Sequence, residues 1–347
     1  MASERGYDSP VQNSFVTMKS FLPIDSLLPD LQRTLQQHTR AVLQAAPGAG
    51  KTTRVPLALL DAPWLDGKKI IMLEPRRLAA RAAARFMARS LGERVGGTVG
   101  YRMHLDRQVS AATRIEVVTE GILARMLQQD ASLETVGLVI FDEFHERSLV
   151  ADLGLALCLD SQSALREDLR LLVMAATLEG DALVQWLDAA PLLSSTGRSF
   201  PVSVRYQPLR ANFARERRAF CAEVSSCVQQ VLREETGSLL VFLPGAGEIR
   251  QLAGLLAAAA LDANVQVAPL YGQLSGREQD AAIEPPGQGK RKVVLATAIA
   301  ETSLTIEGIR VVIDAGLMRM LRFDPNSGLS RLQTRPVSQA AAEQRCG

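Results

Sequence analysis

The feature that most constrains this chain is a series of short, uninterrupted runs of Val, Ile and Leu, each followed by a segment of helical pattern. In the first half of the sequence the runs predict strands over 41–45, 69–73, 115–119, 137–141 and 171–175. A strand with one face in water alternates apolar and polar residues, whereas a strand buried on both faces does not. The runs therefore predict a parallel sheet covered by helices on both faces, which is an α/β fold.

The same alternation stops and then restarts, which predicts two domains. The segment 189–201 contains two prolines, a Ser-Ser-Thr-Gly stretch and no clear periodicity, so we place the domain boundary there. Beyond it the pattern predicts helices and strands in turn, over 214–234, 238–243, 248–260, 265–269, 291–297 and 309–314. A length of 347 residues agrees with two domains of about 150 residues each. We expect the domains to span 21–196 and 201–347.

The two ends of the chain do not continue the alternation of strand and helix. Residues 1–20 are polar and aperiodic and lack the apolar core of a signal peptide, so we expect a disordered N-terminal extension. Near the other end, runs at 318–323 and 329–334 around a Pro-Asn-Ser-Gly turn predict a hairpin. We expect no helix or strand after the hairpin, so the second domain would end on a loop, as a truncated domain does.

The composition restricts what the protein binds and where it works. Hydrophobic residues make up 47% of the chain, which excludes a mainly disordered protein. The four cysteines show no Cys-x-x-Cys spacing, which argues against a zinc site or a disulfide framework and predicts a reducing compartment, the cytoplasm. No apolar run reaches about 18 residues, so we expect no membrane span. The net charge of +2 neither demands nor excludes nucleic acid, because a local basic track can lie within a neutral total.

A glycine-rich stretch, Pro-Gly-Ala-Gly-Lys-Thr-Thr at 47–53, lies between a predicted strand and a helix predicted over 52–60. That context is typical of a phosphate-binding loop, in which glycines let successive N–H groups turn toward phosphate oxygens. The strict pattern has glycine at the position of Ala45, and the alternative is a glycine-rich helix cap. We predict a nucleotide site at Gly48, Ala49, Gly50, Lys51, Thr52 and Thr53, with Lys51 on the β- and γ-phosphates and Thr52 on Mg²⁺.

Two acidic residues follow the strand predicted over 137–141. Asp142 and Glu143 would lie at the carboxyl edge of a parallel sheet, where ligands bind in open α/β folds. We expect Asp142 to hold Mg²⁺ through water and Glu143 to polarise the attacking water, with His145 as a catalytic coupling residue beside them. The alternative is that these acids cap a helix that begins near Ser148.

Eight short motifs, spread over most of the chain, occur in the order in which a known family has them. They occupy 48–53, 74–77, 119–121, 142–147, 175–177, 241–245, 296–306 and 344–347. Their order and wording resemble the DEAH-box helicases of superfamily 2, and the resemblance covers roughly 27–347. A run of eight motifs is far more specific than any one of them.

The resemblance implies two tandem RecA-like domains of the P-loop NTPase type that bind ATP, or another NTP, with Mg²⁺. It implies that Ala176 and Thr177 couple the nucleotide site to a bound strand, that Ser303 senses the γ-phosphate and that Gln344 positions the attacking water. It places the adenine between Arg85 and the position of Leu317, where the family has an aromatic residue. Contacts to the strand are implied for Arg76, Arg77, Thr119, Gly121, Thr297 and Thr305.

From the resemblance we expect an NTP-dependent RNA helicase that acts on single-stranded RNA, as a monomer. A DNA translocase and a non-hydrolysing NTP-dependent clamp are the alternatives. The family motif continues as Gln-Arg-x-Gly-Arg-x-Gly-Arg, and this sequence ends at Gly347, before both catalytic arginines, so we expect nucleotide binding with poor hydrolysis. The hairpin arginines either face RNA or form an ordinary charged edge, and they are Arg319, Arg322, Arg331 and Arg335.

Overall fold

The structure is a computed structural model that describes residues 21–176, 181–195, 201–301 and 306–346. The chain divides into two compact units, one of Met1–Leu73 with Ala83–Gly197 and one of Glu74–Ala82 with Arg198–Gly347. The expected disordered extension at 1–20 lies outside the described residues.

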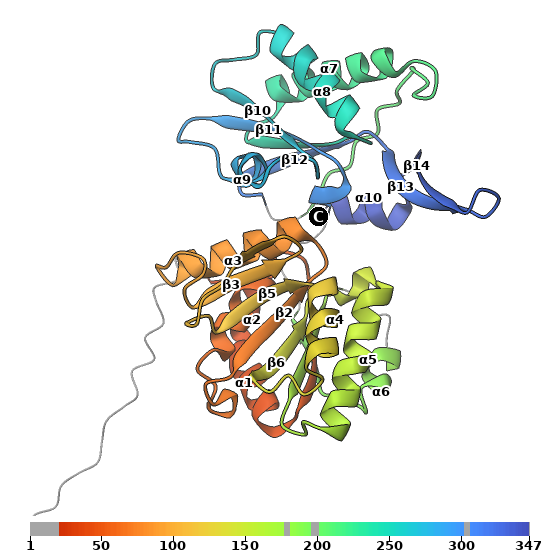
Figure 1. Cartoon of the computed structure of the whole chain (residues 1–347). Helices are drawn as coiled ribbons and strands as arrows, with labels where there is room; N and C mark the ends of the chain where they lie inside the picture. Colours follow the sequence, from red (N-terminus) through yellow and green to blue (C-terminus); the bar gives the residue numbers. More distant parts are fainter. Residues whose placement is uncertain (1–20, 177–180, 196–200, 302–305, 347) are drawn as a thin grey trace, which may run out of the picture. The chain divides into compact units, whose positions relative to one another are not determined.

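The first unit is built on an eight-stranded sheet in the order β4-β3-β5-β2-β6-β7-β1-β8 (Figure 1). Neighbours pair in parallel along β1–β7, β1–β8, β2–β6, β6–β7 and β3–β5, whereas β4 is antiparallel to β3. The predicted strands are all present. The strand bounds are β1 (Arg40–Ala45), β2 (Lys69–Glu74), β3 (Val99–Met103), β4 (Asp106–Gln108), β5 (Ile115–Thr119), β6 (Val136–Phe141), β7 (Arg170–Ala175) and β8 (Leu192–Ser195).

Helices surround this sheet, as the unbroken apolar strands predict. They are α1 (Leu28–Gln37), α2 (Lys51–Leu59), α3 (Arg77–Ser90), α4 (Glu120–Gln129), α5 (Leu149–Ala164) and α6 (Asp181–Trp186), with 3-10 turns η1 (Pro23–Ser26), η2 (Pro63–Leu65) and η3 (Phe144–Glu146). The N-cap of α5 bears on the alternative that Asp142 and Glu143 cap this helix. The N-cap is Ser148, whose hydroxyl accepts a hydrogen bond from the Ala151 N–H at 3.0 Å. Asp142 and Glu143 are therefore not the cap of this helix.

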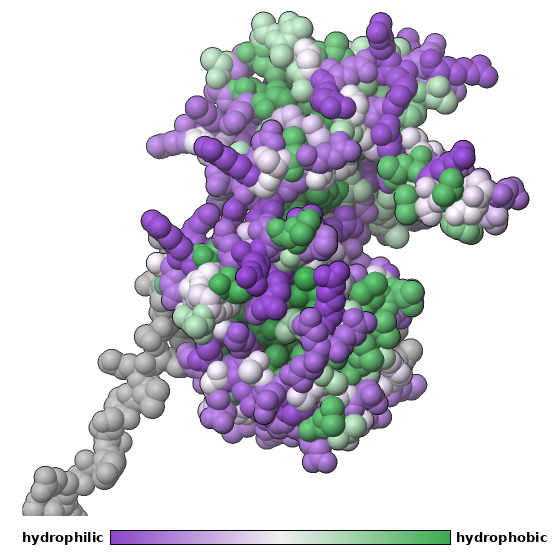
Figure 2. Space-filling model, in the orientation of Figure 1, coloured by the Kyte–Doolittle hydropathy of each residue, from purple (hydrophilic) through white to green (hydrophobic). Residues whose placement is uncertain are grey.

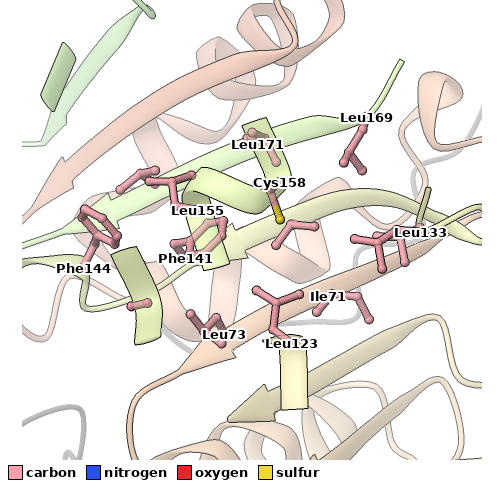
Figure 3. Close-up of a cluster of buried hydrophobic side chains, with 14 of the residues drawn as sticks. Ile71, Leu73, Leu123, Leu133, Phe141, Phe144, Leu155, Cys158, Leu169 and Leu171 are labelled. Atoms are coloured by element: carbon pink, nitrogen blue, oxygen red, sulfur yellow. The ribbon is translucent and has the colours of Figure 1, made fainter. Parts of the chain in front are cut away.

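One hydrophobic core cluster of the first unit lies between the sheet and α4 and α5 (Figure 3). All six residues of β6 are buried, and Phe141 packs edge to face on Phe144 with 6.2 Å between ring centroids. Cys158 of α5 lies fully buried in the same cluster. The opposite side of α5 is also apolar: Leu149 and Leu153 are exposed there, and Figure 2 shows apolar residues over this helix.

The segment predicted to be an aperiodic boundary contains a strand. β8 lies within 189–201 and pairs in parallel with β1, with Val42 opposite Leu192. No strand was predicted in this segment, so β8 is an addition to the predicted elements. Four residues are too few to show a period, so only pairing with β1 reveals the strand.

The second unit contains a four-stranded parallel sheet in the order β10-β11-β9-β12 and a separate two-stranded hairpin. Its core includes Phe220, Val241, Leu252 and Leu295, from α7, β9, α8 and β11. The bounds are α7 (Arg217–Glu234), β9 (Ser238–Phe242), α8 (Ala246–Ala258), β10 (Val265–Leu270), α9 (Gly276–Ile283), β11 (Arg291–Ala296), η4 (Ala298–Ala300), β12 (Ile309–Asp314), β13 (Leu317–Asp324), β14 (Leu329–Pro336) and α10 (Gln339–Cys346).

The hairpin prediction is confirmed, and the expectation of no element after it was wrong. β13 and β14 pair from Leu317–Pro336 to Asp324–Leu329, so the turn falls where Gly328 has a positive φ of 64°. After the hairpin, α10 forms, and the Ser338 hydroxyl accepts a hydrogen bond from the Ala341 N–H at 3.2 Å. Across the parts of the chain that the structure describes, no helix is long and apolar enough to span a bilayer.

Cys158 provides a chemical test of the first core. Burial raises the pKa of this thiol to about 12, so it stays protonated and sheltered near neutral pH. We expect iodoacetamide to modify Cys158 at least about 100-fold more slowly than the half-buried Cys227 in native buffer, because the core must open first. In denaturant both thiols should react at similar rates. Peptide mass spectrometry measures both, and equal native rates would show that this packing is absent.

Candidate functional site

The glycine-rich loop joins β1 to α2, as the strand–loop–helix pattern predicts. Gly48 and Gly50 have φ values of 74° and 94°, which glycine adopts without steric cost. Gly50 is the residue before α2, and its carbonyl accepts hydrogen bonds from the N–H groups of Thr53 and Arg54 at 3.3 and 2.9 Å. Lys51 is thus the first helical residue, and the loop opens on the positive end of the helix dipole, where anions are stabilised.

Lys51 forms a buried ion pair with Glu143. Its Nζ lies 2.8 Å from Glu143 Oε1, and the two side chains are only 4% and 8% exposed. Burial raises the pKa of Glu143, the charge of Asp142 adds to the rise, and Lys51 acts in the opposite direction. The pair places a cation and a carboxylate side by side, in reach of the phosphate loop.

Thr52 and Asp142 meet beside this pair. The Thr52 hydroxyl donates a hydrogen bond to Asp142 Oδ2 at 2.5 Å. A hydroxyl and a carboxylate are oxygen ligands of the kind that Mg²⁺ takes, and Mg²⁺ commonly uses few protein ligands together with substrate phosphates and water. The residues present therefore fit the predicted Mg²⁺ site.

The turn after β6 is conformationally strained. Glu143 and Arg147 have positive φ values of 50° and 45°, which cost free energy for residues other than glycine. Asp142 Oδ1 accepts a hydrogen bond from the Glu143 N–H at 2.8 Å, which holds this conformation. The backbone thereby turns sharply enough to aim two consecutive carboxylates at the loop after β1.

His145 links Glu143 to the end of β7. Its Nδ1 accepts a hydrogen bond from the Ala176 N–H at 3.3 Å, and its Nε2 lies 3.4 Å from Glu143 Oε2. With Nδ1 as acceptor, the neutral ring carries its proton on Nε2 and directs it to the carboxylate. The structure thus joins three predicted site residues, whereas Thr177 lies outside the described residues.

The other predicted residues lie on several elements. Arg77 and Arg85 are on α3, Thr119 ends β5 and Gly121 is in the first turn of α4. Arg76 directly precedes α3, Thr297 directly follows β11, Leu317 begins β13 and Gln344 is on α10. Ser303 and Thr305 lie outside the described residues.

Arg345 is a buried residue whose role the sequence did not reveal. Its Nε and Nη2 donate to Glu301 Oε2 at 2.9 and 2.8 Å, and its Nη1 donates to Asp314 Oδ1 at 2.9 Å. The guanidinium also lies over the Phe242 ring, 4.6 Å from the centroid. With a side chain 2% exposed, Arg345 anchors α10 to β12 and β9. The only sequence signal is its position directly after Gln344 in the last motif.

We expect Arg345→Met to destabilise the second unit by about 3 kcal/mol, because it leaves buried Glu301 without its counter-charge. Arg331→Met on the exposed face of β14 should change the free energy of unfolding by less than about 0.5 kcal/mol. Urea denaturation followed by circular dichroism compares the two variants. Equal stability of both variants and the parent chain would contradict the anchoring role.

The two units match two models of helicase domains. Residues 30–185 match the DEAD/DEAH box helicase domain, and residues 223–347 match the helicase conserved C-terminal domain. Together with the site, these matches show that the chain belongs to the DEAD/DEAH box helicases, with two tandem RecA-like domains.

Among proteins of this family the chain is similar to ATP-dependent RNA helicase HrpB of Escherichia coli, with 54% identity over 94% of this chain and 40% of HrpB. It is 34% identical to ATP-dependent RNA helicase HrpA of the same organism over 96% of this chain and 25% of HrpA. A crystal structure of the Escherichia coli DEAH/RHA helicase HrpB superposes with a TM-score of 0.84, covering 94% of this chain and 41% of that one. The chain thus spans between a quarter and about two fifths of these relatives.

Proposed function

We propose that the protein is an ATP-dependent RNA helicase, which couples NTP hydrolysis to movement along single-stranded RNA and to duplex unwinding. The observation that carries the proposal is the pairing of Lys51 with Glu143 and of Thr52 with Asp142 at the start of α2. The names of the relatives supply the substrate class. The domain bounds 21–196 and 201–347, a monomeric state and a cytoplasmic location belong to the same proposal.

In this proposal the residues of the phosphate loop bind the NTP, and its anionic phosphates compete with Glu143 for Lys51. Glu143 is then free to accept a proton from the attacking water, which is general base catalysis. The Thr52 hydroxyl would hold Mg²⁺ directly and Asp142 would hold it through water, and the bound ion would supply positive charge beside the phosphate oxygens. For Gln344 and Ser303 we propose a role at the γ-phosphate, and for Arg85 and Leu317 a role at the base, as the family resemblance implies.

His145 connects the nucleotide site to residues that we propose respond to a bound nucleic-acid strand. Because it contacts both Glu143 and Ala176, a change at the carboxylate reaches the backbone at the end of β7. We infer that His145, Ala176 and Thr177 couple NTP hydrolysis to movement of the bound nucleic-acid strand. The strand itself is held through phosphate and sugar, which carry no sequence information, by Arg76, Arg77, Thr119, Gly121, Thr297 and Thr305.

A DNA translocase and a non-hydrolysing clamp remain as competing proposals, and two measurements separate them. A helicase that recognises RNA contacts the 2′-hydroxyl, so single-stranded RNA should stimulate hydrolysis more than DNA of the same sequence. Equal stimulation would favour the DNA translocase. Nucleotide-dependent strand binding with no turnover in the complete protein would favour the clamp.

Two substitutions test the nucleotide site in the complete protein. Lys51→Ala should abolish productive binding of a fluorescent ATP analogue, because it removes the cation that meets the phosphates. Glu143→Gln should keep that binding and lower the hydrolysis rate by about 10²–10⁴-fold, because it preserves shape and removes the base. Glu134→Gln, at an exposed position just before β6 and so at the other end of that strand from Asp142, serves as the matched control and should hydrolyse NTP at a normal rate. Retained turnover in Glu143→Gln would sink the assignment of the base.

The salt dependence of RNA binding tests the strand contacts. For contacts to phosphate, log K should fall linearly with log salt, with a slope of about −0.7 per neutralised phosphate on single strands. Replacing Arg76 and Arg77 by alanine should flatten the slope and weaken all sequences alike. The control replaces Arg215, two residues before α7, and Arg218 in its first turn, both of which are exposed. An unchanged slope for the first pair, or a loss confined to some sequences, would contradict backbone recognition.

A further inference from the structure

A short segment ahead of α1 lies directly against the phosphate loop. We call residues 22–25, Leu-Pro-Ile-Asp, the strap. The Ile24 N–H donates a hydrogen bond to the Ala49 carbonyl at 3.2 Å, and the Ile24 side chain is fully buried. A Cβ on Gly50 would lie 2.6 Å from Leu22 Cδ1 and 3.3 Å from Ile24 Cγ2. The strap thus packs against Gly50 on one side and binds the preceding peptide.

The strap is itself held in place. It closes as a turn in which the Leu22 N–H donates to Asp25 Oδ2 at 2.8 Å and the Asp25 N–H donates to the Leu22 carbonyl at 2.9 Å. Asp25 Oδ1 lies 3.8 Å from Nε of Arg54, a largely buried residue of α2. The strap is therefore held to α2, the helix that directly follows the phosphate loop.

The hydrogen bond from Ile24 determines the direction of one loop amide. In a trans peptide the carbonyl and the following N–H point in opposite directions. The Ala49 carbonyl points to the strap, so the Gly50 N–H points away from it. Phosphate loops bind anions through such backbone N–H groups, and the Gly50 peptide needs external support because glycine turns readily between conformations.

We propose that the strap is a positioning element of the nucleotide site: Ile24 and Leu22 fix the Ala49–Gly50 peptide with its N–H toward the phosphates and so set nucleotide affinity. This inference rests on the proposed function, because it takes the loop to bind NTP phosphates. It assigns no chemistry to the strap, which acts only through the loop.

The test measures nucleotide affinity in the complete protein by titration with a fluorescent ATP analogue. Ile24→Ala should weaken binding about tenfold, which corresponds to about 1.4 kcal/mol. Ile24→Val, which keeps the Cγ2 contact with Gly50, should restore affinity to within about twofold of the parent. Leu22→Ala, at a half-buried position, is a milder second variant that should weaken binding about threefold if Ile24→Ala does not fold.

The matched control is Ile115→Ala. Ile115 is also fully buried in the first unit, but it lies on β5, with β2, β6 and β7 between it and β1. It should lower the melting temperature as Ile24→Ala does and leave nucleotide affinity within about twofold of the parent protein. Equal weakening by Ile24→Ala and Ile115→Ala, or no weakening by Ile24→Ala, would overturn the role of the strap while the nucleotide site stands. No binding by the parent protein would overturn the proposed function itself.

Discussion

The parallel run of β6, β7 and β1 is the constraint on which the candidate site depends. Parallel strands end at the same edge of a sheet, so the segments that follow these three strands meet there. Thr52 after β1 and Asp142 after β6 are hydrogen-bonded although 90 positions separate them in sequence. Ala176 follows β7, which lies between the two other strands, and it contacts the site through His145.

Buried ion pairs occur in both units, with different consequences. In the second unit Arg345 meets Glu301 and Asp314 through three of its nitrogen atoms, which fits a fixed anchor. In the first unit a single lysine meets a carboxylate whose pKa is raised by burial, so the ionised form of Glu143 is held at a cost. A phosphate group that took over Lys51 would remove the cation that lowers the pKa of Glu143, so the carboxylate would accept a proton more readily. This asymmetry agrees with an exchangeable pair at a ligand site.

The strained turn after β6 is held by its surroundings. Positive φ at Glu143 and Arg147 persists only where neighbouring contacts over-determine the backbone. Phe144, between them, is buried against Phe141, and the Arg147 guanidinium lies 5.5 Å from the centre of the Phe144 ring. The Ser148 cap then starts α5 directly after the turn. A rigid frame thus surrounds the carboxylate proposed as the base.

Patterns confined to neighbouring residues were enough to determine much of this protein. Buried strands show as unbroken apolar runs, and the glycine loop and the Asp-Glu pair each carry their own local chemistry, so β1, β2, β5, β6 and β7 could be predicted, together with the proximity of the glycine loop to the Asp-Glu pair. β8, the strap and the burial of Arg345 could not. β8 is too short to show a period and is revealed only by its pairing with β1. The sequence of the strap predicts no more than a turn, and its hydrogen bond to Ala49 appears only in the folded chain. Arg345 has the sequence context of a surface charge, and its burial depends on ion pairs with Glu301 and Asp314. Each is decided by contacts between segments far apart in sequence, which exist only once the chain has folded.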